Sequence, residues 1–164
     1  MPTHNQIIYD KNSNLHPAGL TRLGAYFPIE VHVPPQIAEA LTKQGMPVPT
    51  PASGVRLIDT GASITCVDEK ILTGLSLNPI GVVETGTANG PVQQNVYPGR
   101  IVFPTKGWTI DLERVVGVNL AGQSVEAVLE APAIPIIALL GRNFLEQCVF
   151  IYNGTMGSWT ISMA

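Results

Sequence analysis

The residues Asp59, Thr60, Gly61, Ala62 and Ser63 follow directly on the apolar run 55–58, and they are the one segment whose residue types suggest catalysis. A carboxylate at the end of a buried strand is costly unless it is paired or hydrogen-bonded. Gly61 permits a tight turn or a close backbone approach that a side chain would block, and Ala62 and Ser63 are small enough to leave room beside the acid. The alternative is an Asx-type turn at the exit of a strand, in which Asp59 only bonds its own backbone.

A second motif lies about eighty residues further along the chain. The apolar, strand-like run 136–140 ends at Gly141, and a short helical pattern begins at Arg142. An Asp-Thr-Gly-Ala-Ser segment followed by an apolar pair, a glycine and a helix resembles the retroviral-type (retropepsin-like) aspartic proteases. The resemblance spans roughly residues 26–161. It implies that Leu140, Gly141 and Arg142 are a structural motif that passes behind the catalytic loop.

The expected fold is mostly β: a single-domain, retropepsin-like acid protease fold, a closed barrel-like sheet with a flap hairpin and one or two short helices. A chain of 164 residues suits one domain. It is too short for a two-lobed, pepsin-like enzyme, and Asp111, followed by Leu112 and Glu113, is no second catalytic triplet. We expect residues 24–164 to form the protease domain and residues 1–23 to be an irregular N-terminal extension or arm.

The segment between the two motifs contains a hairpin pattern. Strand-like arms at 82–88 and 92–97 flank Asn89, Gly90 and Pro91, and Asn-Gly between such arms is a strong hairpin signal. Its position resembles the flap that closes over substrate in this family, although an ordinary exposed hairpin has the same signature. The resemblance assigns substrate binding to seven residues of the loop and hairpin: Ala62, Ser63, Gly86, Thr87, Ala88, Asn89 and Gly90.

Other segments give weaker patterns. Apolar residues alternate over 26–33, which predicts a half-buried strand with His32 off the apolar face. Residues 35–43 predict a helix that Gly45 can end, and the proline-rich run 46–51 predicts an extended connection. Together, residues 35–53 form an insertion relative to the family. Further strands are expected at 64–67, 108–113, 115–120, 125–129, 149–152 and 158–161, and a turn or single helical turn at 68–72.

Composition excludes several classes of function. Charged residues make up 13% of the chain and the net charge is −3, so no Lys/Arg cluster is present to bind nucleic acid. The three His residues, with Cys66 and Cys148, lack metal-ligand spacing, and we expect no metal, no cofactor and two reduced thiols. No signal peptide is visible, and the apolar stretch 131–141 is too short to span a bilayer. We therefore expect a cytoplasmic protein that does not enter a membrane.

The single catalytic triplet bears on assembly. Hydrolysis of a peptide by aspartates needs two carboxyl groups around one water, and this chain supplies one. The resemblance therefore implies a homodimeric aspartic endopeptidase that acts on peptide or protein substrates, with Asp59, Thr60 and Gly61 of each copy as catalytic residues. The low charge leaves apolar surface for such an interface, although a generous core would give the same composition.

Two points stay open in this interpretation. Many relatives place an acid near Ser63 to pair with the arginine after the later glycine, so the sequence leaves the partner of Arg142 undetermined. The N-terminal arm and the strand 159–164 are the other segments that could hold the dimer. A non-catalytic peptide-binding or dimerisation module with the same fold is the alternative function, and a metal-dependent hydrolase is a weaker third.

Overall fold

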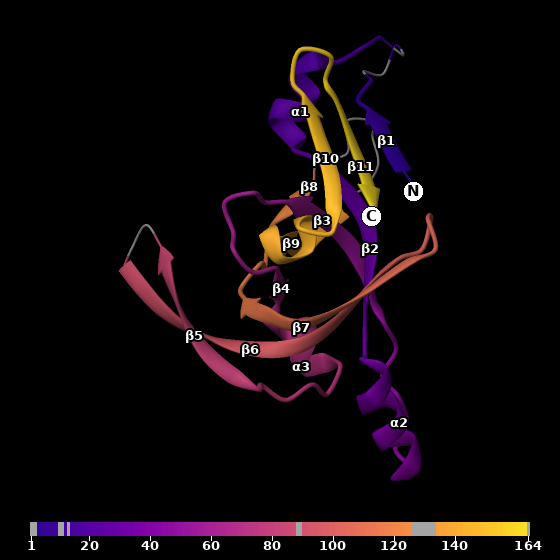
Figure 1. The fold of residues 1–164 in the computed structure, drawn as a ribbon, viewed down its shortest axis with the longest axis vertical. Coiled ribbons are helices and arrows are strands. Elements are labelled where there is room, and N and C mark those ends of the chain that lie inside the picture. The colour runs from indigo at the N-terminus through magenta and orange to yellow at the C-terminus, as the bar shows by residue number, and fades with distance from the viewer. Residues whose placement is uncertain (1–2, 10–11, 13, 88–89, 126–133, 164) are drawn as a thin grey trace.

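The computed structural model describes residues 3–9, 12, 14–87, 90–125 and 134–163, and this part of the chain is mostly β (Figure 1). It contains eleven strands and four short helices. In chain order they are β1 (Thr3–Ile7), α1 (Pro17–Leu23), β2 (Tyr26–His32), α2 (Pro35–Lys43), β3 (Ala52–Ile58), β4 (Cys66–Asp68), α3 (Glu69–Gly74), β5 (Gly81–Thr87), β6 (Gly90–Phe103), β7 (Trp108–Val118), β8 (Ser124–Val125), β9 (Ile134–Leu140), α4 (Arg142–Leu145), β10 (Cys148–Asn153) and β11 (Ser158–Met163).

Six strands close into a barrel. Their order is β2-β3-β9-β4-β7-β6, and β6 pairs back onto β2 to complete the ring. Two of the pairs, β3–β9 and β4–β7, are parallel, and the others are antiparallel. The predicted mostly β, closed-barrel fold is confirmed. β5 pairs only with β6, so the β5–β6 hairpin extends outward from the barrel (Figure 1).

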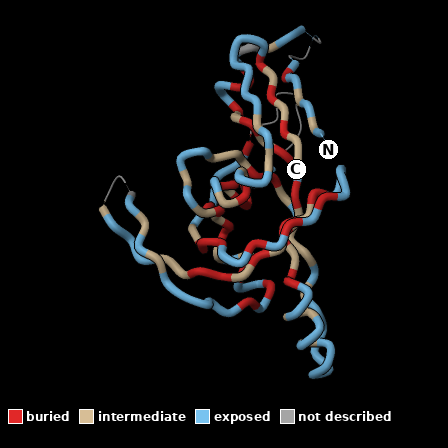
Figure 2. The backbone as a smooth tube through the Cα atoms, viewed as in Figure 1, coloured by how far each residue is buried: buried red, intermediate tan, exposed pale blue. Residues whose placement is uncertain are grey.

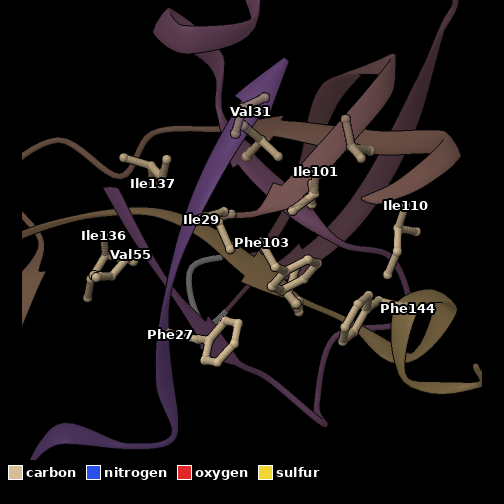
Figure 3. Close-up of a cluster of buried hydrophobic side chains, with 14 of the residues drawn as sticks. Phe27, Ile29, Val31, Val55, Ile101, Phe103, Ile110, Ile136, Ile137 and Phe144 are labelled. Carbon is tan, nitrogen blue, oxygen red and sulfur yellow. The ribbon is translucent and has the colours of Figure 1, made fainter. Parts of the chain in front are cut away.

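The alternating segment 26–33 builds much of the core. Phe27, Ile29, Val31 and Val33 are all buried, as their spacing predicts, and Figure 3 shows Phe27 and Ile29 among side chains from other strands and from α4. Burying each such side chain contributes about 1.5–3 kcal/mol. His32 lies off this face and contacts Glu30 at 2.8 Å. The core therefore fixes the position of β2 and of its neighbour β3, which leads into Asp59.

The prediction that residues 1–23 are irregular is wrong for most of that segment. β1 pairs with β11 from Thr3 opposite Ser162 to Ile7 opposite Ser158. α1 starts with a proline at a position where its missing N–H costs nothing, and it buries Leu20 and Leu23. The first residues thus complete a three-stranded sheet, β1-β11-β10, and Figure 2 shows the burial of each residue along its strands, at the top of the view.

Several predicted boundaries shift. The separate strands expected at 108–113 and 115–120 are one strand, β7, and the strand expected at 64–67 is β4, which starts at Cys66. The turn at 68–72 is the helix α3, which the Asp68 side chain caps by accepting from the Lys70 N–H at 2.9 Å. The strand expected at 125–129 reaches only Val125 in β8, and residues 126–129 lie outside the described residues. The described part has four helices, more than the one or two expected.

The helix expected at 35–43 and the strands expected at 149–152 and 158–161 are present. α2 covers the predicted 35–43, with an exposed Glu39–Lys43 contact of 2.7 Å, and Figure 1 shows it pointing away from the barrel. β10 and β11 form the predicted hairpin. Across the described residues, no helix combines the length and the apolar character that crossing a bilayer requires.

Candidate active site

The loop after β3 is held against the end of β9. The Asp59 N–H donates to the Leu140 carbonyl at 3.0 Å. Further along, the Arg142 N–H donates to the Ala62 carbonyl at 2.9 Å, and the Asn143 N–H donates to the Ser63 carbonyl at 3.1 Å. The two sequence motifs, eighty residues apart, therefore lie side by side, and backbone hydrogen bonds fix the loop that carries Asp59.

Gly141 permits this close contact. A Cβ at this position would lie 2.7 Å from the Ile64 carbonyl carbon, 2.8 Å from its oxygen and 2.9 Å from the Thr65 nitrogen. All three are backbone atoms, which cannot move aside without displacing the loop. Leu140, just before it, is fully buried and anchors the end of β9. The apolar-residue-plus-glycine signal in the sequence thus has a steric cause.

The Asp59 carboxylate sits in a tight turn. The side-chain Oδ1 accepts from the Gly61 N–H at 2.9 Å, and the backbone carbonyl of Asp59 accepts from the Ala62 N–H at 3.3 Å. A Cβ on Gly61 would lie 3.1 Å from that same Oδ1 and would crowd it. The Asx-type turn is therefore present, yet it uses one carboxylate oxygen only. Among the described residues, none donates a hydrogen bond to Oδ2.

Arg142 binds the loop directly. Its Nη1 donates to the carbonyls of Thr60, at 2.9 Å, and Gly61, at 3.1 Å, and its Nη2 donates to the Ser63 hydroxyl at 3.0 Å. Serine at position 63 therefore serves as one acceptor, and backbone carbonyls supply the others. Within one chain the partner of Arg142 is the loop 60–63 itself.

Thr65 and Asn143 complete the support of the loop, and sequence reasoning missed both. The Asn143 Oδ1 accepts from the Thr65 N–H at 2.8 Å and from its hydroxyl at 2.9 Å. The Thr65 hydroxyl accepts from the Gly141 N–H at 3.1 Å, and the Asn143 amide donates to the Arg114 carbonyl at 3.2 Å. The signal that could have found the pair was two hydrogen-bonding side chains, Thr65 and Asn143, in otherwise apolar runs beside the two motifs.

A cleft of about 640 Å³ opens beside Asp59. The loop forms one wall and β5 forms the other, and the lining residues are Asp59, Gly61, Ala62, Ser63, Ile64, Cys66, Val83, Glu84, Thr85, Gly86 and Val116. Of the predicted site residues, the structure brings together Asp59, Gly61, Ala62, Ser63 and Gly86. Thr60 is exposed and does not line the cleft.

The ladder of the hairpin between β5 and β6 reaches Thr87, which pairs with Gly90. The predicted site residues Ala88 and Asn89 lie outside the described residues. Gly90 has a φ of 105° and begins β6, a backbone conformation that favours glycine. Pro91 pairs with Gly86 inside the ladder, and the hairpin reaches well beyond the barrel (Figure 1).

Cys66 lies in the same cleft, which the sequence did not indicate. Burial raises the pKa of its thiol, and the negative charge of Asp59 raises it further, so the thiol stays protonated. Both Cys66 and Cys148 are free. Among the described residues, no group of three or more His, Cys, Asp or Glu side chains is arranged to hold a metal ion.

A comparison with solved structures found a similar protein, and comparisons of the sequence did not. No family model matches this sequence, and no curated protein matches it. A solved structure, the solution structure of the Simian Foamy Virus (mac) protease, aligns with 73% of this chain and 91% of its own, at 20% sequence identity and a TM-score of 0.40. Over the described residues, the chain has a mostly β fold with a closed six-stranded barrel and four short helices.

Proposed function

We propose that this chain is one half of an aspartic endopeptidase, and that the Asp59 residues of two identical copies hydrolyse a peptide bond together. The observation that carries the proposal is the state of the Asp59 carboxylate. One oxygen is fixed by the Gly61 N–H, the other has no hydrogen-bond donor among the described residues, and Asp59 lines a cleft. A carboxylate held in this way is oriented and still available for chemistry.

The chemistry follows from two such groups at close range. Two carboxylates a few ångströms apart cannot both ionise, so they share one proton and titrate as a pair. The ionised group takes a proton from a water between them while the protonated group donates to the carbonyl oxygen of the substrate. The water adds to the carbonyl carbon, and the amine then leaves with a proton from the pair.

Residues around Asp59 have supporting roles in this proposal. The Thr60 hydroxyl has no hydrogen bond with any described residue of its own chain, which leaves it available to bond the loop of the second copy. Arg142 holds the carbonyls of Thr60 and Gly61 and so keeps the loop in one conformation. Gly61 lends its backbone to the carboxylate and keeps it open to the cleft.

The cleft favours an extended peptide as substrate. Its walls are the loop 61–64 and the strand β5, which both offer backbone groups, and an extended peptide can bond to such groups while its side chains vary. In this proposal the β5–β6 hairpin is the flap, and Gly86, Thr87, Ala88, Asn89 and Gly90 close over the substrate.

The test is peptide hydrolysis by the purified protein and by Asp59→Asn. The wild type should cleave members of a peptide library with a bell-shaped pH profile, because one carboxyl must be ionised and the other protonated. Asp59→Asn should lose at least about 10²-fold in rate while its circular dichroism is unchanged. Val48→Lys, on the proline-rich connection away from the cleft, is the control and should keep full activity.

Two results would change the proposal. If Asp59→Asn keeps the wild-type rate, Asp59 is not the catalytic acid. If the wild type binds a statine-type peptide inhibitor but cleaves nothing at any pH from acidic to neutral, the peptide-binding module becomes the better description.

A further inference from the structure

An apolar groove lies between the inserted helix α2 and the segment that leads into β5. Its volume is about 760 Å³. One wall contains Ile37 and Leu41 of α2 and Met46 of the proline-rich connection, and the other contains Leu77 and Pro79. None of its lining residues is charged. The groove therefore suits an apolar, uncharged ligand, and we call it the α2 groove.

The described part of the chain covers only part of the apolar face of α2. Ile37, Ala38 and Leu41 recur at helical spacing and pack partly against the core, yet no residue of α2 is fully buried. Met46, on the connection that follows, is 44% exposed. A short helix is held mainly by the packing of its apolar face, and contiguous apolar surface left open in this way is typical of a binding groove.

The opposite wall of the α2 groove is fixed before any ligand binds. The Ser76 N–H donates to the Thr73 carbonyl at 2.9 Å, and the Leu77 N–H donates to the Leu72 carbonyl at 3.1 Å. Ser76 also has a φ of 58°, and it is the one described residue other than glycine with a positive φ. Such conformations persist where the surrounding structure holds them, often at binding sites. A preformed wall lowers the entropic cost of binding.

The strand β5 connects the α2 groove with the cleft beside Asp59. Pro79 lines the groove, and Val83 is the first residue of β5 that lines the cleft. Four residue steps of about 3.3 Å separate them, which is roughly 13 Å of extended chain. Ile80 and Val82 lie between, and at 61% and 59% they are the most exposed large apolar side chains among the described residues. Apolar surface therefore continues from the groove to the cleft.

The same strand offers a free edge along this path. Among the described residues, β5 pairs only with β6, so its other edge can bond the backbone of an extended peptide. The side chains of that peptide would alternate between the two faces of the sheet. One set would lie beside Val83 and Thr85, which line the cleft, and the other beside Ile80 and Val82. A peptide bound at the cleft can thus reach the groove along a single strand edge.

We infer that the substrate extends from the cleft along the free edge of β5, and that an uncharged, apolar segment of the same polypeptide binds in the α2 groove. This inference rests on the proposed function, because it takes the ligand of the cleft to be a polypeptide. The α2 groove then selects substrates by a sequence several residues from the scissile bond. The helix α2 and the connection after it become part of the substrate-binding surface.

The test compares a short peptide, chosen from those that the wild type cleaves, with longer peptides that contain it. Each longer peptide carries a tail of about ten residues at its N-terminal or C-terminal end, made of alternating Leu and Ser or of alternating Glu and Ser. The Leu–Ser tail should lower KM at least about tenfold at one end or both and leave kcat unchanged, because its contacts do not change during the reaction. The Glu–Ser tail should give no gain. If the Leu–Ser tail lowers KM at neither end, the inference is wrong.

Met46→Lys and Val48→Lys show where the tail binds. Both residues lie on the proline-rich connection and are 44% and 45% exposed, so neither change should unfold the chain. Of the two, Met46 alone lines the α2 groove. The advantage of the Leu–Ser tail over the short peptide should be lost in Met46→Lys and kept in Val48→Lys. An equal advantage in the two variants overturns the inference.

Sedimentation of the same two variants examines a second copy as the occupant of the groove. Met46→Lys and Val48→Lys should have the same oligomeric state as the wild type. If Met46→Lys alone dissociates a wild-type dimer, the groove is a contact between copies, and the inference is overturned.

Binding of the Leu–Ser tail alone separates this inference from the proposed function. The labelled tail, followed by fluorescence anisotropy, should bind the wild type and Val48→Lys alike and bind Met46→Lys at least about tenfold more weakly. If it does so while the wild type cleaves no peptide, the α2 groove is right and the protease proposal fails. If the short peptide is cleaved but the tail neither binds nor lowers KM, the protease proposal stands and the α2 groove inference fails.

Discussion

Arg56 lies on β3 and Arg142 contacts the loop that follows β3, and the surroundings of the two side chains are opposite. Arg142 is exposed, and its guanidinium donates to three acceptors on the loop 60–63. Arg56, on β3 and three residues before Asp59, is completely buried, and none of its three side-chain nitrogens has a hydrogen-bond partner. The Arg142 guanidinium is exposed and makes three hydrogen bonds, whereas the Arg56 guanidinium is buried and makes none with the described residues.

Aromatic rings surround Arg56 in place of acceptors. Its guanidinium carbon lies 4.7 Å from the centre of the Phe27 ring, 5.4 Å from that of Phe103, and 5.9 Å from those of Phe144 and Trp159. Figure 3 shows Phe27, Phe103 and Phe144 converging from β2, β6 and α4. Burial lowers the pKa of the guanidinium to about 9. His4 joins the cluster, with its ring centre 4.3 Å from that of Phe27 and 5.0 Å from that of Trp159.

The two arginines therefore have different roles: Arg142 positions a loop, and Arg56 packs in the core. Hydrogen bonds are directional, so the three from Arg142 can fix the conformation of a loop. Cation–π contacts are attractive but tolerate many orientations, so the rings around Arg56 hold it in place without directing any group toward the cleft. We therefore expect changes at Arg142 to alter catalysis and changes in the Arg56 cluster to alter stability.

Arg142→Ala should have the largest effect on catalysis. Loss of its three hydrogen bonds frees the catalytic loop, and misplacement of a reacting group by about 1 Å can cost about 10²-fold in rate. We expect a fall of that size in kcat/KM with a change of only about 1 kcal/mol in the free energy of unfolding. Arg142→Lys should recover only part, because an ammonium group cannot reproduce the planar, forked geometry.

The matched control is Arg100→Ala, which removes a surface ion pair with Asp111 of 2.7 Å. An exposed pair contributes about 0.2–1 kcal/mol, and the rate should not change. Equal rate losses in the two variants would show that Arg142 has no special role at the loop.

Arg56→Met tests whether the buried arginine affects stability and leaves catalysis unchanged. Methionine keeps most of the volume and removes a buried charge that has no hydrogen-bond partner. Exchange of buried ions for apolar groups of similar size is often stabilising by about 1–4 kcal/mol. We expect the free energy of unfolding, from denaturant titration, to rise by about 2 kcal/mol with kcat/KM unchanged. A fall of similar size would show that the four rings stabilise the cation by more than its burial costs.

His4 should make the docking of β1 depend on pH. Burial lowers the pKa of His4, the positive charges of Lys106 and Arg56 lower it further, and an interaction with Gln6 partly opposes the shift. The docked strand β1 therefore holds a neutral imidazole, whereas an undocked β1 takes up a proton below about pH 6.5. Docking of β1 is at full strength above that pH and weakens as pH falls, by at most about 1.4 kcal/mol per pH unit.

Hydrogen exchange measures this effect. The amides in the ladder between β1 and β11 should exchange faster relative to the barrel strands as pH falls from 7 to 5, after correction for intrinsic rates. His4→Phe should remove the pH dependence, and His16→Gln should keep it. Identical pH dependence in wild type and His4→Phe would show that His4 does not titrate on undocking.

The two regions also differ in how well the sequence predicts them. The Asp59 loop and the Leu140-Gly141-Arg142 motif are local signals, because the tight turn and the close backbone contact each demand particular residue types in a short segment. The alternating strand 26–33 is local in the same sense. Their contact was expected from the resemblance, and the hydrogen bonds that make it are now defined.

The Arg56 cluster has no local signature. Arg56 stands in an apolar run as one charged residue, and nothing nearby indicates that rings from β2, β6, α4 and β11 surround it. The same is true of β1, whose polar sequence predicts no strand until β11 supplies a partner. Long-range pairing determines these features, so they follow from the fold and cannot be read from any single segment.

Mixing two kinds of chain shows whether each chain holds half of an active site. Wild type and Asp59→Asn are combined in equal amounts, diluted until the dimers exchange subunits, and concentrated again before the rate is measured. If both Asp59 residues are needed, only wild-type homodimers are active, and activity should fall to about one quarter of that of the same total amount of wild type. Activity of about one half would mean that each chain works alone, and the proposal that a dimer needs both Asp59 residues would be wrong.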